Sequence, residues 1–336
     1  MFGGARTPAI PDARGRALAG SIARLERVTL GGVPQWITLR GHRADAPLLL
    51  VLAGGPGASQ MPWIHACDTA LERAFVVVHW DQPGAGRTWR AVRDAATLTV
   101  ERYVRDAVAL AELLCARFAR ERLLLVGHSW GSVLAALVAR RIPHRVQALV
   151  GVAQQGVADA TDRLGWERAA AAARAAGDDA TARRLVHQGP PPYAGRAMLA
   201  RWRTLVSAQV RHGGTAESRA REALVQRRAR AAPEHSWFDR LHATRAMERT
   251  FARVYPQLAA LDLARDVPRL DVPVTLALSP HDLVVPPDAA VRWLASLEAP
   301  RTSLVWFERS GHVPQVSEAE KFAGMLEEVL GTALRA

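Results

Sequence analysis

Cysteine and long apolar runs are both scarce in this sequence. Only Cys67 and Cys115 occur among 336 residues, which excludes a disulfide framework, and neither has metal-ligand spacing to a second Cys or to a His pair. No apolar run reaches the length that spans a bilayer, and the segment Met1–Gly20 lacks the apolar stretch of a secretory signal. These absences predict a cytoplasmic protein with no membrane-spanning helix and no bound metal.

Lysine is nearly missing as well, although the net charge is strongly positive. Lys321 is the single lysine, so arginine carries almost all of the 44 basic residues and of the formal net charge of +12. The arginines are spread over Ala-rich stretches such as Ala169–Arg184 and Ala216–Ala232, with Asp and Glu between them. There is no basic block interleaved with aromatics and no nucleic-acid-binding motif. We therefore expect solvated helix faces and no nucleic-acid partner.

Apolar runs alternate with helical patterns along most of the chain. The strands Arg27–Leu30 and Trp36–Arg40 are expected to form a hairpin around the turn Gly31–Pro34. Further runs suit strands buried on both faces: Pro47–Ala53, Phe75–Trp80, Arg122–Gly127, Gln147–Ala153, Pro273–Leu278 and Ser303–Phe307. Helical spacing separates several of them, as in Val104–Phe118, Val133–Val138, Asp288–Leu297 and Glu318–Leu330. This alternation predicts an α/β fold, a mostly parallel sheet with helices on both faces.

The alternation breaks in the middle of the chain. Between about Gly156 and Leu263 the pattern is helical and contains no buried strand run. We expect residues 156–263 to form a helical cap that shapes substrate access, inserted between two parts of one core. Residues 1–155, with the N-terminal hairpin, and residues 264–336 would form those two parts.

The strongest motif is Gly127-His128-Ser129-Trp130-Gly131, which has the form G-x-S-x-G. A nucleophile elbow needs glycines on both sides of the serine because the turn is too tight for side chains there, and it exposes the serine Oγ at the edge of the sheet. The pattern also describes a Gly-rich turn with a capping serine. The strand run before it and the helical pattern after it favour the elbow, with Ser129 as nucleophile.

An elbow serine needs an acid and a histidine later in the chain. Asp282 follows the strand run Pro273–Leu278, and His312 follows the run Ser303–Phe307, so both are expected at the carboxyl edge of the sheet. A neutral imidazole accepts the serine proton, and the carboxylate orients that imidazole. Asp271 and Asp288 are better explained as acids at element boundaries. We expect structural roles for three other histidines, His128, His144 and His281.

The oxyanion hole is expected from two backbone N–H groups. One belongs to Trp130, the residue after the nucleophile, and the other to the loop Ala53–Ser59, where Gly55 is the best candidate and Gly54 borders the substrate. The glycines of this loop do not form a phosphate-binding G-x-x-x-x-G-K-[ST] motif. No cofactor is expected.

Three motifs together resemble those of one enzyme family. Gly54-Gly55-Pro56-Gly57, the segment Trp80–Thr88 and the elbow itself are similar to the motif series of the prolyl aminopeptidase (proline iminopeptidase) branch of the α/β-hydrolases. The resemblance implies an α/β-hydrolase fold, removal of an N-terminal residue from small peptides or amides, and an oxyanion hole from Gly55 and Trp130. It departs at Ala53, where the family usually has His, and at Pro83, where it usually has Arg.

The family uses cap glutamates to bind the substrate's free ammonium group, since an unpaired cation in a closed site is costly. Glu248 is the first candidate for this role here and Glu222 the second, although both also fit as solvated helix residues paired with arginine. Asp81 is expected to hold its own Gly-rich turn, through Arg87, and to take no part in catalysis. The expected substrate is a small molecule or a short peptide.

Two other functions stay open. The same site suits an esterase, thioesterase or acyltransferase of specialised metabolism, which would explain the divergent first loop. A ligand receptor without turnover has no need to retain Ser129, Asp282 and His312 together, which favours an enzyme. A dehalogenase or an epoxide hydrolase needs a carboxylate nucleophile, and Ser129 argues against both. Oligomeric state and leaving group are not encoded in any motif.

Overall fold

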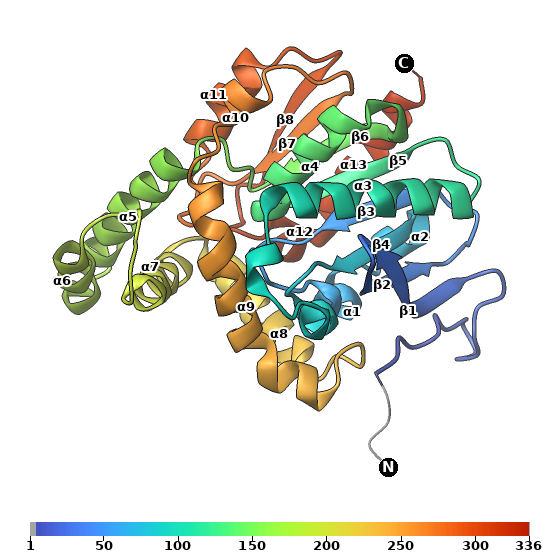
Figure 1. Ribbon diagram of the computed structural model, residues 1–336, viewed down its shortest axis with the longest axis horizontal. Helices are drawn as coiled ribbons and strands as arrows, with labels where there is room; N and C mark the ends of the chain where they lie inside the picture. The colour runs from blue at the N-terminus through green and yellow to red at the C-terminus, as the bar shows by residue number, and fades with distance from the viewer. Residues whose placement is uncertain (1–4, 336) are drawn as a thin grey trace.

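The computed structural model describes residues 5–335, without the side chains of Ala158 and Asp159. Residues 1–4 of the segment Met1–Gly20 and residue 336 of the second core part lie outside the described residues. The centre of the fold is an eight-stranded sheet with strand order β1-β2-β4-β3-β5-β6-β7-β8 (Figure 1). The strands are β1 (Ile22–Leu30), β2 (Val33–Gly41), β3 (Leu48–Leu52), β4 (Val76–Asp81), β5 (Leu123–His128), β6 (Val146–Val152), β7 (Val274–Leu278) and β8 (Thr302–Trp306).

The first two strands form the expected hairpin at one edge of the sheet. β1 pairs with β2 and β2 with β4 in antiparallel register, whereas the remaining neighbours are parallel. The turn consists of Gly31 and Gly32 alone, both with positive φ, as a two-residue hairpin turn requires. β1 begins at Ile22, five residues before the predicted start. Because β1 is an edge strand with exposed positions along its length, its apolar pattern is too weak to mark that start.

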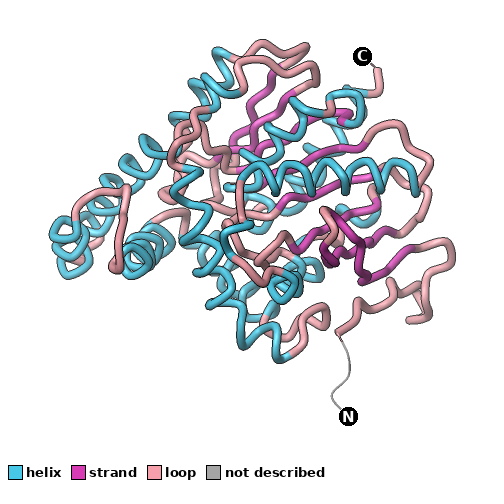
Figure 2. Tube along the Cα trace, viewed as in Figure 1, coloured by secondary structure: helices cyan, strands magenta, loops and turns pink. Residues whose placement is uncertain are grey.

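Helices cover both faces of the sheet (Figures 1 and 2). Alternate residues of β3 point to opposite faces. Leu48, Leu50 and Leu52 belong to the cluster of α3 (Val100–Arg117), α4 (Trp130–Arg141) and α11 (Asp288–Ser296). Leu49 and Val51 belong to the cluster of α2 (Leu71–Ala74) and α13 (Ala319–Ala333). Burial on both faces explains why the central strands are continuous apolar runs.

Helices also form the segment between β6 and β7. They are α5 (Ala158–Ala175), α6 (Asp179–Gln188), α7 (Met198–His212), α8 (Ala216–Ala229), α9 (Trp237–Leu258) and the short α10 (Leu263–Asp266). Val157 and Asp262, at the two ends of this insertion, form an isolated antiparallel bridge. In Figure 1, α5, α6 and α7 project away from the sheet, whereas α8 and α9 lie closer to it.

The insertion packs in two different ways. α5, α6, α7 and α9 share a small core of their own, which includes Leu185, Trp202 and Tyr255. In contrast, α8 packs against helices outside the insertion. Its Val225 contacts Val316 of α12 (Pro314–Ser317) and Cys67 of α1 (Ile64–Cys67). Side chains on α8 are therefore held against the loop that follows β8.

Candidate active site

Ser129 occupies a strained turn between β5 and α4. Its φ of 53° and ψ of −121° lie in a region that non-glycine residues rarely adopt. A Cβ on Gly127 would lie 2.2 Å from the carbonyl oxygen of Gly131, and a Cβ on Gly131 would lie 2.0 Å from that of Leu52. Both flanking positions therefore require glycine. The turn is held by the Ser129 N–H, which donates to the Val152 carbonyl at 2.9 Å.

Asp282 and His312 meet at the carboxyl ends of β7 and β8. His312 Nδ1 lies 2.9 Å from Asp282 Oδ2. The other carboxylate oxygen, Oδ1, accepts the backbone N–H groups of Val284 at 2.8 Å and Val285 at 2.9 Å. Asp282 is only 2 % exposed, so these three contacts replace water around its carboxylate. The imidazole is thereby oriented by a carboxylate that is itself fixed.

The charges around His312 set its protonation. Burial pushes the pKa of His312 down, but the Asp282 carboxylate, by charge and by hydrogen bond, and the Glu222 carboxylate raise it above its ordinary value of 6.5. The net result is a raised pKa, so His312 is a stronger base than a free imidazole. A stronger base accepts a proton from serine more readily.

His128 contacts the backbone of His312 with one ring nitrogen and Gln60 with the other. Its Nε2 lies 2.9 Å from the His312 carbonyl oxygen and its Nδ1 2.9 Å from Gln60 Nε2. Burial lowers the pKa of His128 to about 3, and the charge of His312 adds to that lowering. The ring is therefore neutral, with its proton on Nε2 to donate to the carbonyl and a lone pair on Nδ1 to accept from the amide. Gln60 was not singled out by sequence, because nothing in its local pattern marks it.

A cavity of about 800 Å³ lies at this edge of the sheet, and it is lined by Ser129, His312, Gly54 and Gly55. Gly55 has a φ of 128°, and a Cβ there would lie 2.6 Å from the N atom of Gly57. Trp130 is the first residue of α4, so its N–H has no acceptor within the helix. The residues predicted for the nucleophile, the base and the two oxyanion donors thus lie together, and their catalytic roles stay predictions.

Glu222 and Glu248 both line the cavity but have different surroundings. Glu248 forms an ion pair with Arg203 at 2.8 Å, and the arginine side chain is 64 % exposed. Glu222 accepts a hydrogen bond from Ser317 Oγ at 3.1 Å. Burial raises the pKa of Glu222, while the Ser317 hydrogen bond and the charge of His312 oppose that rise. Glu222 therefore interacts electrostatically with the His312–Asp282 pair, whereas the charge of Glu248 is paired with Arg203.

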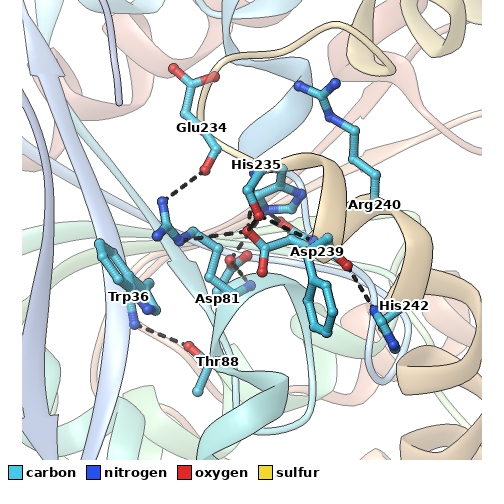
Figure 3. A network of polar contacts seen from close by, with 12 residues as sticks. Trp36, Asp81, Thr88, Glu234, His235, Asp239, Arg240 and His242 are labelled. Carbon is cyan, nitrogen blue, oxygen red and sulfur yellow. Dashed lines mark hydrogen bonds and ion pairs between the residues drawn. The ribbon is translucent and has the colours of Figure 1, made fainter. Parts of the chain in front are cut away.

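Asp81 contacts the loop that joins α8 to α9. Its Oδ2 accepts the backbone N–H of Arg87 at 2.7 Å, so it holds its own turn as expected. The same oxygen lies 3.3 Å from His235 Nε2, and Arg87 donates to the Glu234 carbonyl at 3.2 Å (Figure 3). Burial alone would raise the pKa of Asp81, but His235, Ser59 and the Arg87 N–H lower it overall. This network, which the sequence did not reveal, ties the insertion to the core.

Among the side chains that the structure describes within residues 5–335, which exclude Asp159, no three His, Cys, Asp or Glu residues are grouped so that they could hold a metal ion. Over the same residues, no helix combines the length and the apolar character needed to cross a membrane.

Comparison with known proteins places the chain among aminopeptidase-like hydrolases. The model of the family described as serine aminopeptidase, S33, matches residues 46–316. The probable aminopeptidase YbaC of Bacillus subtilis (strain 168) is 26 % identical over 308 residues, which cover 91 % of this chain and 96 % of the relative.

Two solved structures illustrate the shared fold. A proline iminopeptidase-related protein from Thermus thermophilus has a TM-score of 0.64 at 21 % identity, covering 92 % of this chain and 98 % of its own. The 2-hydroxy-6-oxo-6-phenylhexa-2,4-dienoate hydrolase from Rhodococcus sp. strain RHA1 has a TM-score of 0.63 at 20 % identity, covering 94 % and 100 %. At these identities the structures establish the fold alone. Since the family model spans most of the chain, the protein belongs to the serine aminopeptidase (S33) family of α/β-hydrolases.

Proposed function

We propose that the protein is a serine hydrolase that removes an N-terminal aminoacyl group from a small amide or peptide through an acyl-enzyme. The observation that carries the proposal is the 2.9 Å contact between His312 Nδ1 and Asp282 Oδ2, on the same cavity as the strained Ser129. With Nδ1–H donated to Asp282, the unprotonated Nε2 is available to accept the Ser129 proton.

The reaction follows from these roles. As Ser129 Oγ attacks the substrate carbonyl carbon, its proton moves to His312 Nε2, and the carbonyl oxygen becomes an oxyanion. The N–H groups of Trp130 and Gly55 would stabilise that oxyanion. The imidazolium then gives its proton to the leaving amine, which departs and leaves the acyl group on Ser129. Water, deprotonated by His312, attacks the acyl carbon and releases the acid and free Ser129.

The aminoacyl preference rests on Glu222. A substrate with a free α-ammonium needs a carboxylate partner when it enters a partly closed site, because an unpaired cation loses its hydration there. Glu222 is half-buried, lines the cavity and raises the pKa of His312 by its negative charge. Glu248 is a weaker candidate since Arg203 already neutralises it. The names of the relatives, an aminopeptidase and a proline iminopeptidase-related protein, agree with this preference.

The size of the cavity favours a second candidate, hydrolysis of an ester or thioester with a bulky apolar acyl group. A volume of about 800 Å³ is in the upper part of the range for drug-sized ligands, well beyond one aminoacyl group. Much of its wall is apolar, with Leu199, Trp202, Val206 and Phe251 among the residues.

One comparison tests the two candidates. Turnover of prolyl and alanyl nitroanilides would be measured beside that of short- and medium-chain nitrophenyl esters and acyl thioesters. A kcat/KM for the aminoacyl amides that is lost when the α-amine is acetylated would support the aminopeptidase. Turnover of esters or thioesters without any aminoacyl amide cleavage would replace it with the second candidate.

The cytoplasmic location and the absence of nucleic-acid partners stay predictions.

A further inference from the structure

One buried amide connects the two segments assigned to the oxyanion hole. Gln82 follows the last residue of β4 and is 1 % exposed. Its Nε2 donates to the carbonyl oxygen of Ala53 at 3.0 Å, and its Oε1 accepts from the indole Nε1 of Trp130 at 2.9 Å. In the sheet β3 lies between β4 and β5. Gln82 therefore reaches from the end of β4, past the end of β3, to the helix that follows β5.

The residues at the two ends of this bridge stand next to the proposed donors. Ala53 precedes Gly54 and Gly55 in the loop after β3, and the backbone N–H of Trp130 follows Ser129. The two segments also lie close together. A Cβ on Gly54 would lie 3.3 Å from Ser129 Cβ, and a Cβ on Gly131 would lie 2.7 Å from the Ala53 carbonyl oxygen. The space between the segments is thus too narrow for added side chains, and the Gln82 bridge opposes a wider separation.

We propose that Gln82 is a positioning residue that holds the N–H groups of Gly55 and Trp130 at the separation needed to bind the oxyanion. The inference rests on the proposed serine-hydrolase function. It also follows from the chemistry of the side chain, since the Gln82 amide donates through Nε2 and accepts through Oε1 at once. Glutamate would present a second acceptor to the Ala53 carbonyl, and methionine would leave both that carbonyl and the buried indole N–H without a partner.

The chain contains a matched control in the same sheet. Gln35 on β2 is fully buried, its Oε1 accepts from the indole Nε1 of Trp80 at 2.8 Å, and its Nε2 donates to the Leu30 carbonyl at 3.2 Å and to Asp106 Oδ2 at 2.7 Å. Neither Gln35 nor Trp80 lines the cavity. Gln35→Met and Trp80→Phe therefore remove the same kinds of hydrogen bond away from the site.

The experiment compares Gln82→Met and Trp130→Phe with those two controls. Trp130→Phe deletes one indole N–H and retains the backbone N–H of residue 130, so it carries the test if Gln82→Met does not fold. We expect each of the two site variants to lose about 10- to 100-fold in kcat because small displacements of oxyanion donors are costly. KM should stay within about threefold, since binding of the ground state does not depend on these donors. The double variant should lose little more than either single one.

Three further readouts separate positioning from stability and from the proposed function. The rate of Ser129 labelling by a fluorophosphonate should fall with kcat, and this readout does not need the correct substrate. An aminoacyl boronate with a free amine, which forms a tetrahedral adduct with the serine, should bind more weakly to Gln82→Met, whereas a product acid should not. The control variants should lower the Tm by a similar amount and keep kcat within about twofold.

Two outcomes would overturn this inference alone. Unchanged kcat and labelling in Gln82→Met and Trp130→Phe would show that the bridge does not position the donors, and equal losses in Gln35→Met would show a general effect of stability. If the parent protein turned over its substrates and Ser129 was labelled, the proposed function would survive either result. Failure to label Ser129 in the parent would overturn the proposed function and this inference with it.

Discussion

Replacing Glu222 with Gln is expected to impair cleavage of aminoacyl nitroanilides and to leave the plateau rate of nitrophenyl acetate hydrolysis, above the pKa of His312, nearly unchanged. The substitution keeps the shape of the side chain and its ability to accept from Ser317 Oγ, but it removes the negative charge from the cavity wall. Nitrophenyl acetate has no ammonium group, so it reports any general damage to the site.

The magnitude follows from the half-buried position of Glu222. Two unit charges about 4 Å apart interact by about 4 kcal/mol where the effective dielectric constant is near 20. Part of that energy is lost to desolvation, and hydrogen bonds to charged groups retain about 1.5–3 kcal/mol, which corresponds to about 10- to 150-fold in kcat/KM. At pH 7 most of the substrate's α-amine is protonated, because its ordinary pKa is about 7.7–8.

The assay is steady-state kinetics of the parent, Glu222→Gln and Glu248→Gln on both substrates at pH 7. Glu248 is the matched control, since it lines the same cavity and already pairs with the exposed Arg203. Its substitution should change kcat/KM for the nitroanilide by no more than about fivefold, in keeping with the small energy of exposed ion pairs. Equal losses on both substrates in Glu222→Gln, or a larger selective loss in Glu248→Gln, would refute the assignment of the ammonium to Glu222.

Three further outcomes are expected. Ser129→Ala should abolish fluorophosphonate labelling and lower kcat by several orders of magnitude, and labelling of another serine would redirect the mechanism. Asp282→Asn should lower kcat by about 10³–10⁴ because the amide permits the wrong imidazole tautomer. Asp288→Asn should cost only its partly exposed ion pair with Arg168. Kinetics and Tm of both variants test this, and a larger loss of kcat in Asp288→Asn would contradict the assignment. In the pH profile for nitrophenyl acetate, activity should fall as pH drops through the pKa of His312, which lies above 6.5. Because the Glu222 carboxylate stabilises the imidazolium, Glu222→Gln should move that limb to lower pH, and an upward shift would contradict the electrostatic argument.

The sheet could be predicted from sequence because its central strands are covered on both faces. β3 is buried at every position, so it appears in the sequence as an uninterrupted apolar run bounded by Pro47 and Gly54. The edge strand β1 was predicted too short because it is not covered in this way. Its half-exposed positions tolerate polar residues, so its apolar alternation is weak. The helical character of the insertion was also predicted, from the absence of any such run.

The candidate site was predictable to the extent that local geometry dictates residue type. A turn in which an added Cβ would overlap backbone atoms must have glycine, and this requirement marks the neighbourhood of Ser129 and Gly55 in the sequence itself. The position of Asp282 and His312 after two strand runs predicted that both would reach the carboxyl edge, and their 2.9 Å contact agrees with that placement. Their participation in catalysis stays a prediction.

Only the tertiary structure decided which side chains pair across the sheet and across the insertion. Glu222 and Glu248 look alike in sequence, and they differ because α8 packs against the loop after β8, whereas Glu248 faces Arg203. Gln82 has no local signature, because its partners lie 29 and 48 residues away. Those partners meet it only after β3 is inserted between β4 and β5. The sequence by itself therefore determined the strands, the glycine turns and the order of the reactive residues, since steric overlap and burial act locally. The polar contacts that orient those residues depend on strand order and helix docking, which arise from packing between distant segments.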